Sequence, residues 1–371
     1  MDVSRPGRRP AGVVTVLLAL VLLHGCVPLA SRQTPASQPQ QPPPPRCLLL
    51  KHGWDMPSMD RLARNPDLLS RHPFAGVMLD SPLRDRVFAR EALTDAQAGQ
   101  ALEPYCGVPG RESRHDLLLL LASHTSTNLR PPDFLASWQV VRDNLAAVAD
   151  AAREAGLRGL AFDNEPYGVN WFALDAAMTA RADADTWSAA AFARGSEVMS
   201  TLEEHWPGAV LMVFLGPGVS VDRQGRLREP FPLLGPFYAG MVAARRQVRF
   251  IDGGENYRLE TPEQFAAFAR AVKHPDPSRY PFLPPDLAAR WPGQVEAAFG
   301  VYDRAFNGIA AGDLLEPMLL HQRLADACNA TEGYVWLYTE VLRWWDDDTP
   351  PPPAYTGLVG TLPHTRWPSE K

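Results

Sequence analysis

The sequence predicts an α/β protein whose main domain, residues 47–371, is a single (β/α)8 TIM barrel. From residue 47 onward, short apolar runs alternate with helical patterns, and eight such runs fall within about 300 residues. The runs are continuously apolar, which is typical of parallel strands covered on both faces. A doubly wound open sheet is the alternative. The first run is not followed by a glycine-rich phosphate loop, which disfavours that alternative.

The expected strands are the eight apolar runs themselves. They cover residues 47–55, 76–80, 116–124, 159–163, 209–216, 248–252, 297–303 and 333–340. Helices are expected between them, at 58–70, 133–155, 170–205, 231–247, 261–273 and 313–331. The segment 133–155 is the best marked, because its apolar residues recur at steps of three and four. It follows Pro131-Pro132 and ends before Gly156, which are natural start and stop signals.

The first 26 residues have the pattern of an export signal. Arg5, Arg8 and Arg9 precede an apolar run at 13–23 that is too short to span a bilayer comfortably. The run leads into Leu-His-Gly-Cys, which resembles a bacterial lipobox and implies lipidation of Cys26. Residues 27–46 are proline-rich and polar, as in an extended linker. We therefore expect a lipid-anchored protein of the bacterial cell envelope, periplasmic or on the outer surface; plain secretion or an uncleaved anchor is the alternative.

Composition excludes several classes of partner and cofactor. The formal net charge is −6 and the pI about 5.9, so no broad basic face is present to bind nucleic acid. The nine histidines form neither His-x-His nor His-Glu-x-x-His, and no metal or other cofactor is expected. Beyond Cys26, three cysteines remain, Cys47, Cys106 and Cys328, which allow one disulfide in an oxidising compartment.

Polar residues close seven of the eight runs. Chemistry in a barrel occurs at the C-terminal ends of its strands, so these residues are the first site candidates. They are Asp55, Asp80, His124, Asp163 with Glu165, Asp252 with Glu255, Asp303 and Glu340. Aspartate is common in turns, and turn chemistry alone explains part of this set.

Aromatic residues accompany several of these carboxylates. Trp54, Tyr167 and Tyr257 lie beside Asp55, Glu165 and Glu255 respectively. Trp336, Tyr338 and Glu340 are spaced by two, so in a strand they share a face. Sugar rings stack on aromatic faces, and paired carboxylates hydrolyse glycosidic bonds. The sequence thus predicts a glycoside hydrolase acting on an oligo- or polysaccharide.

The fourth run carries two resemblances. Asn164-Glu165-Pro166 resembles the Asn-Glu-Pro of clan A retaining glycosidases, which implies that Glu165 is the proton donor and that Asn164 binds the sugar 2-hydroxyl. That clan has its nucleophilic Glu at the seventh strand, where this chain has Asp303.

Asp163-Asn164-Glu165, with Tyr167 close behind, also resembles the Asp-x-Glu end of the family 18 chitinase-like motif. In that family the substrate's own N-acetyl group attacks. Ala161 replaces the first aspartate of the motif, and Tyr302-Asp303 is similar to the Tyr-Asp of a later strand. The stretches 54–58, 252–257 and 338–345 resemble a bacterial group of glycosidase-like barrels without settled activity.

The candidate catalytic residues are therefore Glu165 with Asp163, and a partner that is Glu340 or Glu255, with Asp303 ranked behind them. Asp163 and Glu165 are two apart, so their repulsion is expected to raise one pKa. The separation of the reacting pair would decide between retention and inversion. Two other functions stay open: a carbohydrate-binding or pseudoenzymatic envelope protein, and a metal-dependent hydrolase on the same barrel.

Overall fold

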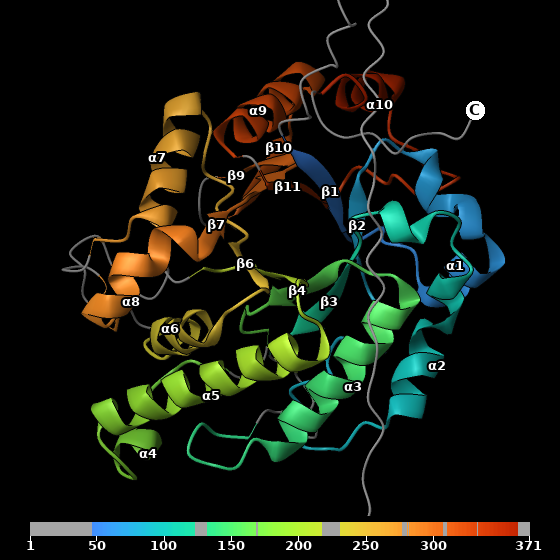
Figure 1. Cartoon of the computed structure of the whole chain (residues 1–371). Helices are drawn as coiled ribbons and strands as arrows, with labels where there is room; N and C mark the ends of the chain where they lie inside the picture. The colour runs from blue at the N-terminus through green and yellow to red at the C-terminus, as the bar shows by residue number, and fades with distance from the viewer. Residues whose placement is uncertain are drawn as a thin grey trace, which may run out of the picture. The chain divides into compact units, whose positions relative to one another are not determined.

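Eight parallel strand positions close into a barrel, as the sequence predicts (Figure 1). This computed structural model describes residues 47–122, 132–167, 170–216, 231–276, 280, 282–306, 310–331 and 333–362. The predicted export signal, its Cys26, the proline-rich linker and His124 lie outside these residues. Within them, no helix combines the length and apolarity needed to cross a membrane.

The strands agree closely with the predicted runs. They are β1 (Leu48–Gly53), β2 (Gly76–Leu79), β3 (Leu117–Leu121), β4 (Gly159–Asp163), β5 (Val210–Val213), β6 (Arg249–Asp252), β7 (Val295–Ala297), β8 (Phe299–Tyr302) and β11 (Tyr334–Thr339). β7 and β8 are separated only by Ala298. β7 pairs with β6 and β8 pairs with β11, so this one segment closes the ring.

Helices surround the barrel (Figure 1). They are α1 (Met59–Arg64), α2 (Asp95–Cys106), α3 (Gln139–Ala155), α4 (Ala176–Thr179), α5 (Ala184–His205), α6 (Leu234–Ala244), α7 (Pro262–Lys273), α8 (Pro285–Arg290), α9 (Pro317–Ala330) and α10 (Pro353–Val359), with the short 3-10 turns Pro66–Arg71, Arg111–Ser113 and Trp291–Gly293. The predicted helix 170–205 is divided into α4 and α5, because Asp183 caps a new helix start. The sequence did not predict α2, α8 or α10.

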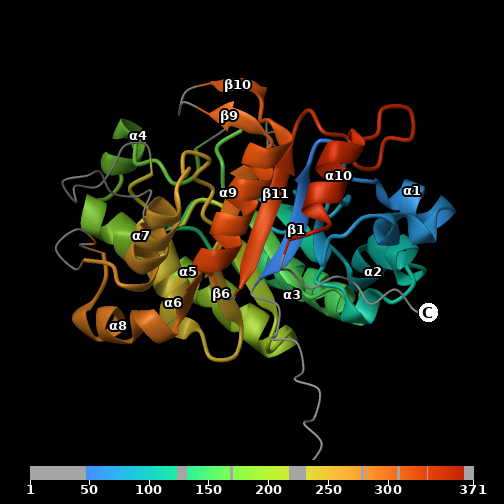
Figure 2. The same ribbon diagram turned by 90° about the horizontal axis from the view of Figure 1, so that it is seen from above.

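An antiparallel hairpin, β9 (Arg304–Phe306) and β10 (Ala311–Leu314), follows β8. Figure 2 shows it at one end of the barrel, beyond the strands. Because it directly follows the end of β8, this is the C-terminal end, where barrel sites lie.

A disulfide joins Cys47, at the start of β1, to Cys328 in α9. Both cysteines are buried, and Cys106 is the free cysteine of the described part of the chain. The bridge links residues 281 positions apart and ties the last long helix to the first strand.

Two separate apolar cores fix the direction of every strand side chain. The core inside the barrel contains Leu50, Met78, Ala161 and Ile251, whereas their sequence neighbours pack outward against the helices. Since side chains alternate along a strand, this register determines which residues at the strand ends face the barrel mouth. Four side chains at the strand ends point into the barrel, on the same side as the inner core residues of their strands: His52, Asp80, Asp163 and Tyr338. Four others do not: Asp55, Asn164, Asp252 and Asp303.

Candidate active site

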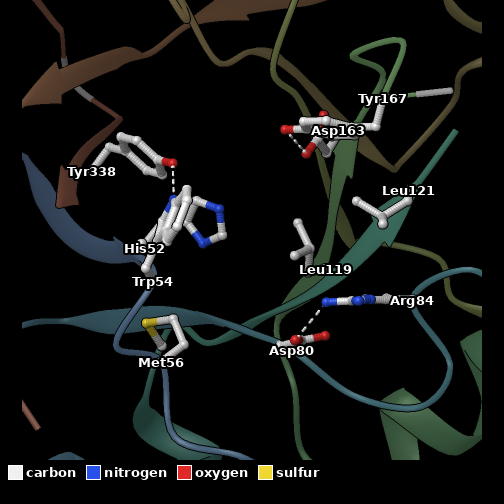
Figure 3. A pocket seen from close by; sticks show the side chains of 11 residues that line it. His52, Trp54, Met56, Asp80, Arg84, Leu119, Leu121, Asp163, Tyr167 and Tyr338 are labelled. Carbon is white, nitrogen blue, oxygen red and sulfur yellow. Dashed lines mark hydrogen bonds and ion pairs between the residues drawn. The ribbon is translucent and has the colours of Figure 1, made fainter. Parts of the chain in front are cut away.

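The side chains that point into the barrel border a cavity of about 500 Å³ at its C-terminal mouth. Figure 3 shows His52, Trp54 and Tyr338 on one side, Asp163 and Tyr167 opposite, and the Asp80–Arg84 pair below. The cavity is lined by His52, Gly53, Trp54, Met56, Asp80, Arg84, Leu119, Leu121, Asp163, Tyr167 and Tyr338. Residues from β1, β2, β3, β4 and β11 thus meet in one pocket.

Two carboxylates and a tyrosine form a cluster after β4. Asp163 is buried, and its Oδ1 accepts a hydrogen bond from the backbone N–H of Glu165 at 3.0 Å. The Tyr167 hydroxyl lies 2.5 Å from Glu165 Oε2 and 2.9 Å from Asp163 Oδ2. Burial, and secondarily the charge of Glu165, raises the pKa of Asp163 to about 7. This cluster therefore holds a proton near neutral pH.

Glu255 faces the same cluster from the end of β6. Gly254 adopts the left-handed conformation with φ 62°, and a Cβ there would come within 2.2 Å of the Ala298 carbonyl oxygen, so the turn requires glycine. Glu255 Oε1 accepts a hydrogen bond from the Tyr257 hydroxyl at 2.7 Å. Its Oε2 is buried without a hydrogen-bond partner among the described residues.

The electrostatics of Glu255 depend on the β4 cluster. Burial raises its pKa well above the usual value, and the negative charges of Glu165 and Asp163 raise it further. Three carboxyl groups from two strands therefore act on one another at the mouth. Such a group titrates as a unit, and repulsion keeps at least one proton on it.

Glu340 has a different environment. Its Oε2 accepts a hydrogen bond from Arg304 Nη1 at 3.1 Å, in an ion pair with the residue that begins β9. Burial raises the pKa of the Tyr302 hydroxyl, and a hydrogen bond with Glu340 and the charge of Glu340 raise it further. Of the two predicted partners for Glu165, Glu255 is therefore the one coupled to the β4 cluster, and Glu340 is held by the hairpin.

Three predicted site carboxylates point away from the mouth. Asp55 Oδ1 accepts from Lys51 Nζ at 2.7 Å, and Asp303 Oδ2 accepts from the backbone N–H groups of Val341 and Leu342. Asp252 is buried on the outer side, next to Gly254 N–H, and burial raises its pKa to about 7. These carboxylates organise the loops of the rim. The sequence placed them in the substrate-binding group, but the structure does not bring them to the cavity.

Asn164 likewise faces outward. Its amide donates to the Leu215 carbonyl at 2.9 Å and to the Tyr238 hydroxyl, and its Oδ1 accepts from Leu215 N–H. The side chain is buried, so it clamps the loop after β5 instead of facing the cavity. The hydrogen bond to a sugar 2-hydroxyl that the clan A resemblance implies has no counterpart in this placement.

The predicted aromatic residues separate into rim and core. Trp54 is 70% exposed and donates from Nε1 to the Tyr338 hydroxyl at 2.6 Å, while Tyr167 is 54% exposed on the opposite side. Tyr257 stacks on Tyr338, and both are half-buried. Trp336 is fully buried under this layer, stacked on Phe214 with centroids 4.8 Å apart. Tyr302 is also buried, in contact with the Tyr257 ring.

The polar lining residues Arg84 and His52 were not among the predicted site residues. Arg84 Nη1 donates to Asp80 Oδ2 at 2.7 Å, and both side chains are partly exposed. The spacing of four between them was the available signal. His52 lies two residues after the inner Leu50, and burial lowers its pKa to about 3, so the ring is neutral.

A second cavity of about 460 Å³ adjoins the first. It shares Met56, Asp80 and Arg84 with the mouth cavity and continues over the start of α1. The remaining lining is polar in large part and includes Ser58, Asp60, Ser81 and Asp85. The two cavities therefore adjoin at Met56, Asp80 and Arg84.

The described residues contain no group of three or more histidines, cysteines, aspartates or glutamates with the geometry to hold a metal ion. Asp163 and Glu165 share the Tyr167 hydroxyl, and Glu255 Oε1 accepts from the Tyr257 hydroxyl. The arrangement can exchange protons with a bound substrate and offer it an ionised oxygen.

Comparison with known proteins yields only distant structural likenesses. No protein-family model matches the chain, and no curated protein sequence does. The chain is similar to a GH18 chitinase from Pseudoalteromonas aurantia, with 13% identity, a TM-score of 0.37, and coverage of 79% of this chain and 94% of that one. A GH5-4 broad specificity endoglucanase from an uncultured bacterium is 10% identical with a TM-score of 0.41, and 78% of this chain covers 82% of it.

The catalytic domain of a GH18 chitinase from the fern Peteris ryukyuensis is also 10% identical with a TM-score of 0.41, and 85% of this chain covers all of it. All three scores are below 0.5. The barrel assignment therefore rests on the strand pairing described above, and any function rests on the site.

Proposed function

We propose that the protein is a glycoside hydrolase whose reacting groups are Glu165 and Glu255. The observation that carries the proposal is the electrostatic coupling of Glu255, after β6, with Glu165 and Asp163, after β4, at one barrel mouth. Their chain positions are about 90 residues apart, so no local turn requirement explains their convergence. Structural ion networks also perturb pKa values, but the hydrogen bonds found for these three carboxylates among the described residues come from tyrosine hydroxyls and a backbone N–H, and none comes from a cation.

Hydrolysis of a glycosidic bond needs one protonated and one ionised carboxyl group. The acid protonates the leaving oxygen as its bond to the anomeric carbon breaks, and the second carboxylate attacks that carbon or deprotonates the attacking water. The raised pKa of Glu255 keeps a proton in the pair near neutral pH. Tyr167 lies within hydrogen-bond distance of both β4 carboxylates, and its hydrogen bond to Asp163 favours the ionised form of that carboxylate. The free protein can thus hold both states at once.

The expected substrate is an oligo- or polysaccharide. Trp54 presents an exposed indole face at the edge of the cavity, and Tyr167 presents a phenol ring opposite it. Such flat apolar surfaces stack on the C–H faces of sugars. The open cleft offers room beyond a single ring.

The proposal is tested by screening residues 47–371 against cellulose, mannan, xylan, chitin and aryl glycosides. Wild type is expected to release reducing sugar from at least one of them, and Glu165→Gln is expected to lose that release while retaining its unfolding temperature. Full activity of Glu165→Gln would contradict the assignment. Saccharide binding without release by wild type would identify a carbohydrate-binding protein in its place.

The proton donor can be identified by comparing substrates whose leaving groups do and do not need protonation. A variant lacking the acid retains activity on aryl glycosides whose leaving phenol needs no protonation, whereas a variant lacking the other carboxylate loses activity on every substrate. Glu165→Gln and Glu255→Gln are therefore expected to differ in this test. The raised pKa of Glu255 favours Glu255 as the donor, whereas the clan A resemblance implies Glu165, and the variant that retains activity on aryl glycosides identifies which of the two it is.

We also propose that the protein is exported and anchored by a lipid on Cys26. The disulfide between Cys47 and Cys328 supports export, because such bonds persist in oxidising compartments. In a bacterial host, the wild-type chain is expected to partition into detergent, and Cys26→Ser is expected to partition into the aqueous phase. Equal partitioning of both chains would contradict the anchor.

A further inference from the structure

The mouth cavity, which Asp163 and Tyr167 line on one side, meets the second cavity at Asp80 and Arg84. The two cavities have Met56, Asp80 and Arg84 in common, so an occupant of the first can extend into the second without leaving the surface. Trp54 and Met56 supply apolar surface on the β1 side of this path.

The Asp80–Arg84 pair has the chemistry of a sugar-binding group. Arg84 Nη1 donates a hydrogen bond to Asp80 Oδ2, and a guanidinium has five N–H donors in a planar arrangement. Asp80 presents carboxylate oxygens as acceptors beside those donors. Adjacent donors and acceptors suit the vicinal hydroxyls of a pyranose, each of which both donates and accepts.

A purely structural role is the alternative explanation for the Asp80–Arg84 pair. Both side chains are partly exposed, and an exposed ion pair contributes little to stability. The pair lines both cavities and so lies where they adjoin. Its location is therefore better explained by a ligand than by stability.

The charges of the cleft restrict the class of ligand. Asp60, Asp80 and Asp85 line the second cavity together with a single cation, Arg84. An acidic surface repels uronic acids and sulfated sugars. It accepts uncharged sugars, whose hydroxyls bind carboxylates without a charge penalty.

We propose that the second cavity is a distal subsite for a chain of uncharged sugars, entered across the Asp80–Arg84 pair. The inference rests on the proposed function for the identity of the ligand as a saccharide. It goes beyond that function by defining the direction of the chain, which runs from β4 towards β2 and α1, and by excluding acidic polymers.

The test is the dependence of affinity on chain length. Oligosaccharides of two to six units from the cello, manno, xylo and chito series are titrated calorimetrically against the Glu165→Gln variant, and the series that binds most tightly is used. Affinity is expected to rise by about tenfold between short and long members. In Glu165→Gln/Arg84→Met this rise is expected to disappear, because Arg84 lines both cavities where they meet.

A second variant distinguishes loss of the subsite from a folding defect in Arg84→Met. Asp60 is exposed in the first turn of α1 and lines only the second cavity, so Asp60→Trp fills that cavity without touching the first. It is expected to remove the same rise. Arg61→Met is the matched control, because Arg61 pairs with Asp347 and lines neither cavity.

The outcomes separate the two proposals. Hydrolysis by wild type without any gain from chain length, or equal weakening of short and long members by Arg84→Met, would overturn the distal subsite alone. A gain with length but no hydrolysis would overturn the proposed function alone. Tighter binding of oligogalacturonides than of uncharged chains would overturn the assignment of ligand class, and failure of every series to bind would overturn both proposals.

Discussion

The Tyr167 hydroxyl donates a hydrogen bond of 2.5 Å to Oε2 of Glu165. The Tyr167 hydroxyl oxygen also lies 2.9 Å from Oδ2 of Asp163, so one phenol contacts both carboxylates of the β4 cluster. This relationship could not be foreseen from the spacing alone, because Pro166 and Tyr167 turn back towards the strand end. It makes Tyr167 a positioning residue of the proposed site as well as one of its proposed sugar platforms.

Tyr167→Phe is expected to shift the acid limb of the pH profile of kcat/KM to higher pH. The hydrogen bond from Tyr167 lowers the pKa of Asp163, so its loss favours the protonated form. Loss of a hydrogen bond to a charged group also predicts a decrease of about ten- to hundredfold in kcat/KM near pH 6. The measurement is the pH dependence of both proteins, and an unchanged acid limb would show that Tyr167 does not control these carboxylates.

Two tryptophans that look alike in the sequence are expected to respond differently to truncation. Trp54→Ala is expected to weaken saccharide binding by up to about tenfold with little change in stability, because the indole is exposed. Trp336→Ala is expected to lower the free energy of unfolding by about 3–5 kcal/mol, because the side chain is buried and stacked on Phe214.

Denaturant titrations and binding isotherms of both tryptophan variants test this contrast. A large loss of stability in Trp54→Ala, with no effect on binding, would remove that residue from the proposed platform.

Asp252→Asn is expected to be more stabilising at pH 8 than at pH 5. Burial raises the pKa of Asp252 to about 7, against an ordinary value of 3.8 in the unfolded chain. The stability associated with its proton is fully present below about pH 4 and is lost as the pH rises through 7. Asparagine has no such titration, so the difference between variant and wild type grows by on the order of 2 to 3 kcal/mol over this interval.

Unfolding free energies of wild type and Asp252→Asn at the two pH values measure that difference. An equal difference at pH 5 and pH 8 would show that Asp252 is ionised throughout. Because the carboxylate faces away from the cavity, the substitution is expected to leave saccharide binding unchanged.

The barrel was predictable because its strands are apolar on both faces. The run 159–163 coincides with β4, and the other seven differ by a few residues at their ends. The seventh position could not be predicted in detail, since the break at Ala298 depends on pairing with β6 on one side and β11 on the other. The hairpin β9–β10 was missed because its strands are only three and four residues long, are partly exposed and form no continuous apolar run.

The site was only partly predictable, for the same physical reason. A strand that is apolar on both faces does not reveal which face is inner, so Asp55, Asp252 and Asp303 could not be distinguished from Asp80 and Asp163. The spacing of two did place Asp163 with Glu165, and Trp336 with Tyr338. The choice between Glu255 and Glu340 required tertiary structure, because Arg304 reaches Glu340 from 36 residues away.

The most direct test of the central claim compares Glu255→Gln with Glu340→Gln on the substrate that wild type hydrolyses best. The coupling of Glu255 to the β4 cluster predicts a decrease in kcat/KM of at least about a thousandfold for Glu255→Gln. The ion pair with Arg304 predicts that Glu340→Gln stays within about threefold of wild type on the same scale. The reverse order, with Glu255→Gln active and Glu340→Gln inactive, would contradict the assignment of the reacting pair.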